Sequence, residues 1–257
     1  LCRHVVVGVL KELQLVIRGR LHSRWLLRRS LSFRNRRKGL LHCCCRTRND
    51  RRVRDVSPQR AALEEVRIEL RDATDDARIE TVARGFGATV MMTAAEHASG
   101  TDRIAEVAAR CGWANDEVVV NLQGDEPNLP AELVEQVAEL LLAHPRAALA
   151  TLATPVLSRE EYLDPNAVKV VTDLHGRAMY FSRAPIPWPR DGGMPAVRRH
   201  VGIYAYRAGG LRAISAAPPC ALEQTEKLEQ LRALWLGFRI IVADAVEPPS
   251  PHVDTEE

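Results

Sequence analysis

The feature that most constrains the fold is a short apolar run, Glu117–Leu122 (EVVVNL), in which three valines follow one another. A β-rich run without polar alternation is typical of a parallel strand that is buried on both faces. The stretch before it, Gly100–Cys111, repeats Ile104, Val107 and Ala108 at helical spacing. A strand buried on both faces needs helices above and below it, which favours an α/β fold.

Strands and helices alternate through the rest of this part of the chain. We therefore predict an α/β fold with a mainly parallel sheet and an antiparallel insertion near residues 168–207. The other expected strands are Arg67–Leu70, Thr89–Thr93, Ala148–Pro155, His200–Arg207 and Arg239–Ala243, with a hairpin of Val168–Asp173 and Arg177–Ser182. The other expected helices are Asp75–Phe86, Pro130–Ala143 and Leu222–Leu236.

The first 71 residues have a different composition from the remainder. They contain 17 Arg and 2 Lys against 6 acidic residues, whereas the remainder has 17 basic and 27 acidic residues. Four of the six cysteines also lie there, three of them consecutively, which fits neither zinc-ligand spacing nor a disulfide framework. We expect residues 1–71 to be poorly ordered and residues 72–257 to form the domain.

The composition also bears on partners and location. No apolar run approaches the ~20 residues that span a bilayer, and no secretory signal is recognisable, which predicts a soluble, intracellular protein. Basic charge of the density found in residues 1–71 binds nucleic-acid backbones without sequence preference. Only Trp25 and Phe33 offer stacking surfaces there, and no recognised module is present, so a nucleic-acid partner is disfavoured.

Several segments carry side chains suited to chemistry. Asn121–Pro127 directly follows the buried strand, where ligands of open α/β sheets bind, and Asp125 beside a glycine suits Mg²⁺. The same residues also suit an ordinary turn. Ser99 and Thr101 are candidate helix caps at a helix start that attracts anions, and Arg103 could contact a phosphate.

The later segments are weaker taken singly. Arg183 follows the hairpin and precedes a rigid Pro-Ile-Pro stretch, so it could hold a carboxylate or simply lie on the surface. His200 and Tyr204 share one face of a strand, because four residues is an even step. Glu223–Arg232 resembles a solvated helix face, and Asp254 with its following threonine resembles an N-cap.

Taken in order, these segments resemble the 3-deoxy-manno-octulosonate (Kdo) cytidylyltransferases. The resemblance covers about 185 residues, and the ordered set of motifs is far more specific than any one of them. The segments that carry it are Ala73–Asp76, His97–Arg103, Val120–Pro127, Pro165–Val171, Tyr180–Trp188, Arg199–Arg207, Leu228–Arg232 and Val253–Thr255.

The resemblance implies a Rossmann-like nucleotide-diphospho-sugar transferase fold, a cytoplasmic homodimer, and CTP, Kdo and Mg²⁺ as ligands. It implies that CMP-Kdo forms by attack of the sugar's anomeric hydroxyl on the α-phosphorus of CTP, for lipopolysaccharide assembly. By the same similarity, Asp125 and Asp254 hold the metal. Ser99, Gly100 and Arg103 lie at the cytidine. The Kdo pocket is formed by Gln123, Arg183, His200, Tyr204, Glu229 and Gln230, with Arg183 facing the sugar carboxylate.

Two family features are not found: a basic, glycine-containing loop that wraps the triphosphate, and a final helix after Glu257. Residues 1–71 are therefore expected to be non-native, of the kind produced by reading GC-rich DNA in a wrong frame, and the chain to be weakly active or inactive. Two alternatives stay open. One is a cytidylyltransferase for another acidic sugar, such as a sialic acid, and the other is an inactive fragment whose basic arm binds nucleic acid.

Overall fold

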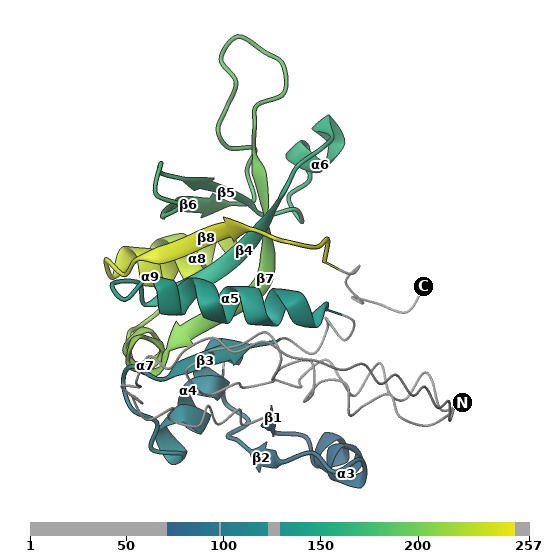
Figure 1. The fold of residues 1–257 in the computed structure, drawn as a ribbon, viewed down its shortest axis with the longest axis vertical. Coiled ribbons are helices and arrows are strands. Elements are labelled where there is room, and N and C mark those ends of the chain that lie inside the picture. The colour runs from purple at the N-terminus through teal and green to yellow at the C-terminus, as the bar shows by residue number, and fades with distance from the viewer. Residues whose placement is uncertain (1–70, 98, 123–128, 250–257) are drawn as a thin grey trace, which may run out of the picture.

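The computed structural model describes residues 71–97, 99–122 and 129–249, and its elements carry the labels of Figure 1. Strands and helices alternate along most of this part of the chain, which confirms the α/β class. The strands are β1 (Asp72–Thr74), β2 (Val90–Met92), β3 (Val118–Asn121), β4 (Leu149–Pro155), β5 (Lys169–Thr172), β6 (Ala178–Ser182), β7 (Arg198–Arg207) and β8 (Ile240–Asp244). The helices are α3 (Ala77–Gly85), α4 (Gly100–Arg110), α5 (Ala131–Ala143), α6 (Arg159–Leu163), α7 (Ala208–Ala216), α8 (Ala221–Glu226) and α9 (Gln230–Trp235).

Strand β7 is the centre of a six-stranded sheet. β3, β4 and β5 each pair with it in antiparallel fashion, and β8 pairs parallel to β4. β3, β4, β5 and β8 consequently run in one direction, and β6 and β7 oppose them. β1 and β2 form a separate parallel pair. The predicted sheet is confirmed in the sense that four of its six strands share one direction, while β6 and β7 from the predicted antiparallel insertion run against them.

Helices cover both faces of the sheet, as the apolar run of β3 requires. Val118 and Val120 of that strand pack on one face with Leu133 and Val137 of α5. Val119 packs on the other face, in a cluster that also holds the buried side chains of α4, α7 and α9. Figure 1 shows α5 lying across the sheet strands, on the opposite side from α9. The core therefore lies in two layers, one on each side of the sheet.

The prediction of one helix over Leu222–Leu236 is wrong. α8 ends at Glu226 and α9 begins at Gln230, with Lys227 in the left-handed region at φ 54° and ψ 48°. Arg232 forms a buried ion pair with Glu223, nine residues earlier. On one straight helix these residues would be ~13 Å apart along the axis, so the pair requires the chain to turn back between them.

Two helices were not predicted. α6 has five residues, too short for a periodic signal. α7 begins Ala-Gly-Gly, which disfavours a helix in isolation. A Cβ at Gly209 would meet the Asn115 side chain at 3.0 Å, and one at Gly210 would meet the Ala148 side chain at 3.0 Å. The close packing of α7 on its neighbours therefore favours glycine at both positions.

The remaining predictions for the first part of the chain fall largely outside the described residues. The strand expected at Arg67–Leu70 lies there, as does all but the last residue of the segment 1–71, and the described strand in this region is β1.

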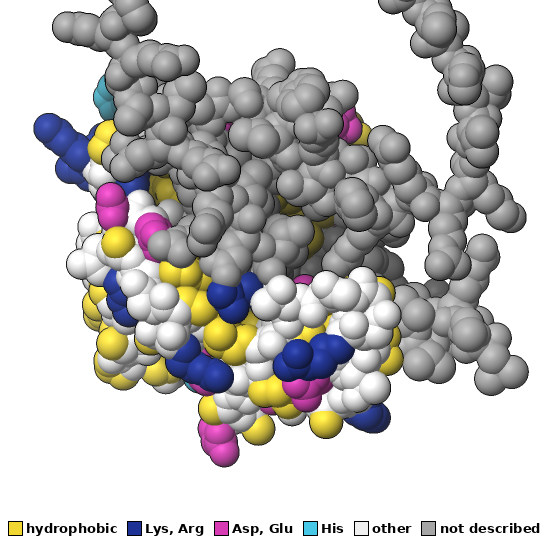
Figure 2. Space-filling model, turned by 60° about the horizontal axis from the view of Figure 1, so that its bottom comes forward, with side chains coloured by type: hydrophobic (Ala, Val, Ile, Leu, Met, Phe, Trp, Pro, Cys, Tyr) yellow, Lys and Arg dark blue, Asp and Glu magenta, His cyan; other side chains and the backbone are white. Residues whose placement is uncertain are grey.

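Figure 2 shows that basic and acidic side chains are interspersed with hydrophobic ones on the described part of one end of the molecule. Within the described residues, no helix is both long and apolar enough to cross a membrane.

Candidate functional site

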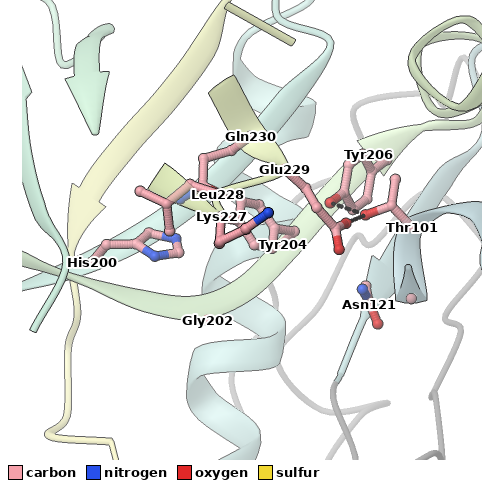
Figure 3. A pocket seen from close by; sticks show the side chains of 11 residues that line it. Thr101, Asn121, His200, Gly202, Tyr204, Tyr206, Lys227, Leu228, Glu229 and Gln230 are labelled. Carbon is pink, nitrogen blue, oxygen red and sulfur yellow. Dashed lines mark hydrogen bonds between the residues drawn. The ribbon is translucent and has the colours of Figure 1, made fainter. Parts of the chain in front are cut away.

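A cavity of about 190 Å³ lies where β7, the end of β3, the start of α4 and the link between α8 and α9 meet (Figure 3). Two sets of side chains face each other across it. We call the set on β7 the strand wall and the set from Lys227 to Gln230 the turn wall. The lining residues are Gly100, Thr101, Asn121, His200, Gly202, Tyr204, Tyr206, Lys227, Leu228, Glu229 and Gln230.

The strand wall is a row of rings on alternate residues of β7. The ring centroids of His200 and Tyr204 are 5.1 Å apart, and those of Tyr204 and Tyr206 are 5.7 Å apart. The register of β7 against β4 shifts between Val201 and Tyr204, which leaves Gly202 in an irregularity of the ladder. Such irregularities re-aim side chains beside functional sites. The predicted shared face of His200 and Tyr204 is confirmed by their ring contact.

Contacts with a buried hydroxyl indicate which nitrogen of the His200 imidazole carries the proton. Thr151 Oγ1 donates to the Ile203 carbonyl at 2.7 Å and lies 2.9 Å from His200 Nε2. A hydroxyl has one proton, so Nε2 must donate to it and the imidazole keeps Nδ1 as an acceptor. Burial lowers the pKa of His200 to about 3, so the ring is neutral at neutral pH. His200 therefore offers the pocket an uncharged group.

The turn wall depends on side-chain contacts. Glu226, the last residue of α8, accepts from Ser182 Oγ at 2.6 Å and from the Arg183 backbone N–H at 2.9 Å. Arg183 Nε donates to the Glu226 carbonyl at 2.7 Å. These bonds tie the end of β6 to the link that carries Lys227. A non-glycine residue in the left-handed region costs about 1–2 kcal/mol, so this link is held against a backbone preference.

Glu229 joins the turn wall to α4. Its Oε2 accepts from Thr101 Oγ1 at 2.6 Å, and the same hydroxyl lies 3.5 Å from the Tyr206 hydroxyl (Figure 3). Burial raises the pKa of Glu229, while hydrogen bonds from Thr101 and Ser99 act in the opposite direction. Among the described residues, the pocket therefore contains one half-buried carboxylate, and its hydrogen bonds orient it.

Asn121 ends β3 at the edge of the cavity. Its side chain is 2% exposed, and within the described residues its Oδ1 has no hydrogen-bond partner. A buried polar atom without a partner is uncommon, because desolvation without a hydrogen bond is costly. Asn121 Oδ1 can therefore accept a hydrogen bond from a ligand.

The cavity brings together five of the predicted residues. Gly100, His200, Tyr204, Glu229 and Gln230 line it, although Gly100 is separated from the other four by a hundred residues or more along the chain. Ser99 lies beside it as the N-cap of α4, where its side chain accepts from the Asp102 N–H. That cap confirms the predicted helix start.

Both predicted arginines are engaged outside the lining. Arg103 Nη1 donates to Thr93 Oγ1 at 2.6 Å, and Nη2 pairs with Asp75 at 3.1 Å. Arg183 uses Nη1 on the Pro165 carbonyl at 3.0 Å, besides its bond to the Glu226 carbonyl. In this structure Arg103 connects α4 to the residues that follow β1 and β2. Arg183 connects the residue before the turn wall to the Pro165 carbonyl.

The predicted metal ligands cannot be placed. Asp125, Asp254 and the substrate residue Gln123 lie outside the described residues. Among the residues that are described, no cluster of three or more His, Cys, Asp or Glu side chains could hold a metal ion.

Six lining residues were not predicted to contact a ligand, although Thr101 was named as a candidate helix cap. Tyr206 shares the strand face of His200 and Tyr204, so strand periodicity could have indicated it. Asn121 stands at the carboxyl end of a strand, a second usable signal. Nothing in the sequence indicated Lys227, because its position follows from the break between α8 and α9. The six are Thr101, Asn121, Gly202, Tyr206, Lys227 and Leu228.

The chain matches known proteins along most of its length. Residues 60–240 match a family described as cytidylyltransferase, so the match begins before the expected boundary at residue 72. The chain is 56% identical over 189 residues to the 3-deoxy-manno-octulosonate cytidylyltransferase of Thioalkalivibrio sulfidiphilus, covering 71% of this chain and 76% of the relative. It is 54% identical over 195 residues to the protein of the same name from Pseudomonas syringae pv. syringae, covering 72% and 76%.

A solved structure agrees with these relatives. CMP:2-keto-3-deoxy-manno-octonic acid synthetase complexed with CTP is 41% identical and superposes with a TM-score of 0.66, covering 71% of this chain and 74% of that one. Fold, identity and coverage point to the same group as the ordered motifs. The chain therefore belongs to the cytidylyltransferase family, and within it to the 3-deoxy-manno-octulosonate cytidylyltransferases.

Proposed function

We propose that this chain transfers the cytidylyl group of CTP to Kdo, giving CMP-Kdo and pyrophosphate. The observation that carries the proposal is the cavity in which Gly100, expected at the cytidine, lies with four residues expected at the sugar acid. In the reaction the anomeric oxygen forms a bond to the α-phosphorus and loses its proton, while the bond to pyrophosphate breaks. The protein's task is mainly to position the two substrates and neutralise charge.

The lining has the chemistry to recognise a polyhydroxylated sugar acid. The Glu229 carboxylate and the His200 Nδ1 can accept hydrogen bonds from sugar hydroxyls, and Gln230 can both donate and accept. Tyr204 and Tyr206 add ring faces against which the carbon skeleton can pack. Lys227 is the cation that lines the cavity among the described residues, and the sugar's carboxylate is the complementary charge.

We assign Mg²⁺ to Asp125 and Asp254 on the resemblance, and both positions lie outside the described residues. Hard oxygen ligands suit this ion, and when bound it neutralises charge on the reacting phosphate. By the same resemblance we propose a cytoplasmic homodimer. The alternative acceptor, a sialic acid, is not favoured, because the relatives that match are named for Kdo.

The test is turnover by the purified chain with CTP, Kdo and Mg²⁺, followed as pyrophosphate release, with CMP-Kdo identified by mass spectrometry. N-acetylneuraminate in place of Kdo, and UTP in place of CTP, are the matched controls. We expect product with CTP and Kdo, formed slowly because the loop that wraps the triphosphate was not found in the sequence, and at least about tenfold less with either replacement. Absence of CMP-Kdo, or equal turnover with N-acetylneuraminate, would contradict the proposal.

A further inference from the structure

Behind the cavity, a buried guanidinium connects α9 to other parts of the fold. Arg232 is 5% exposed and donates from Nε to Glu223 Oε2 at 2.7 Å, while Nη2 bonds the second oxygen of that carboxylate. Its Nη1 donates to the Ile214 and Ala217 carbonyls, both at 3.3 Å. Arg232 does not line the cavity.

The same Nη1 also faces the first turn of α4. It lies 3.8 Å from Asp102 Oδ1, an oxygen that is buried and has no hydrogen-bond partner among the described residues. The other oxygen, Oδ2, accepts from Ser99 Oγ at 2.8 Å. A carboxylate removed from water requires a compensating charge or hydrogen bond. Arg232 is the cation that the described contacts supply to Asp102.

The two helices that this contact joins carry residues expected at different substrates of the proposed reaction. α4 begins with Gly100 and Thr101, on the side expected for the nucleotide, and α9 is preceded by Glu229, on the side expected for the sugar acid. Thr101 donates to Glu229, and the Arg232 backbone N–H donates to the Glu229 carbonyl at 3.0 Å. Arg232 and Glu229 thus share one helical turn.

We propose that Arg232 and Asp102 are positioning residues, which set the start of α4 against the start of α9 and thereby the nucleotide against the sugar acid. The inference rests on the proposed function. Small errors in the relative placement of two reactants lower the rate strongly, and the two residues can cause such errors although neither lines the cavity. Glu223 holds the far side of the same guanidinium and supports the fold instead.

The experiment compares Asp102→Asn with Glu223→Gln. Each change replaces one of the two carboxylates that face Arg232 by an amide of similar shape. We expect Asp102→Asn to lower kcat about tenfold, with less than about twofold change in KM for CTP or Kdo and little change in Tm, because each substrate still binds but the two are misplaced. Glu223→Gln, which removes the closer pair, should lower Tm more and change kcat by less than about twofold. Equal kcat changes in the two variants, or none in Asp102→Asn, would overturn the proposal.

Amide hydrogen exchange gives a readout that needs no turnover. Asp102→Asn should speed exchange both at residues 99–103 and at residues 228–232, whereas Glu223→Gln should act on residues 220–226 and spare the start of α4. Exchange that rises at only one of the two sites in Asp102→Asn would contradict the coupling. If the wild-type chain makes no CMP-Kdo, the proposed function fails, and the exchange experiment still decides whether α4 and α9 are coupled through this pair.

Discussion

The side chains of the strand wall belong to a strand that is paired along both edges. Those of the turn wall belong to the link between two six-residue helices and to the first residue of the second helix. The rings of the strand wall are held by a backbone ladder and by one another. The turn wall is held by a few side chains, chiefly Glu226 and Thr101. One side-chain change should therefore alter chemistry alone on the strand wall, but both chemistry and placement on the turn wall.

The largest effect is expected from Glu229→Gln on the turn wall. It removes the charged acceptor of the cavity, and a hydrogen bond to a charged group contributes about 1.5–3 kcal/mol, or ~10–100-fold in kcat/KM. Burial raises the pKa of Glu229, so the wild type should lose activity on acidification at a higher pH than an ordinary Glu would cause. The acid limb should be absent in the Gln variant. The measurement is a pH profile of kcat/KM for both proteins.

Thr101→Val is the matched control for that change, since it removes the hydroxyl that orients Glu229 and leaves the carboxylate in place. We expect a loss of about tenfold or less, because the carboxylate keeps its charge and loses only the hydroxyl that orients it. A loss in Thr101→Val as large as in Glu229→Gln would mean that placement, rather than the charge, dominates on the turn wall.

A middle-sized effect is expected from His200→Gln on the strand wall, in the pH dependence of stability. The pKa of His200 is about 3 in the fold, against ~6.5 in an unfolded chain. Between these values the unfolded chain binds a proton that the native one does not, so the free energy of unfolding falls as the pH drops below ~6.5. The loss between pH 7.5 and 5.0 amounts to at most about 2 kcal/mol.

The midpoints of urea unfolding at pH 7.5 and pH 5.0 measure this loss of stability. His200→Gln should shrink the difference between them, whatever it does to stability at pH 7.5. An unchanged difference would show that His200 titrates normally and that the strand wall is open to solvent. Activity at neutral pH should fall by about tenfold, because the Gln amide is not held in the position of the imidazole Nδ1.

The same contrast explains which parts could be predicted from the sequence. β3 and the shared face of His200 and Tyr204 follow from local periodicity, which the backbone ladder preserves. The break at Lys227 could not be predicted, because it depends on the pairing of Glu223 with Arg232 and on burial of side chains from other elements. Local pattern favours a continuous helix there, and tertiary contacts override it.

The placement of Arg103 and Arg183 was beyond sequence reasoning for a similar reason. An arginine can reach many acceptors, and its sequence neighbours do not specify which. In the structure both guanidinium groups bond to protein atoms near the cavity: the Thr93 hydroxyl and Asp75 for the first, and backbone carbonyls for the second. The metal ligands assigned by resemblance, Asp125 and Asp254, stay predictions.

The smallest effect is expected at Lys227, where charge and backbone strain can be separated. Lys227→Gly removes the cation and relieves the left-handed backbone, whereas Lys227→Met removes the cation alone and keeps the side-chain length. An exposed ion pair is worth about 0.2–1 kcal/mol, so both variants should raise KM for Kdo about two- to fivefold. Only Lys227→Gly should gain stability, by up to about 1 kcal/mol in urea unfolding. A KM that rises in Lys227→Gly but not in Lys227→Met would show that the backbone of the turn wall, and not its ammonium group, sets the affinity for the sugar acid.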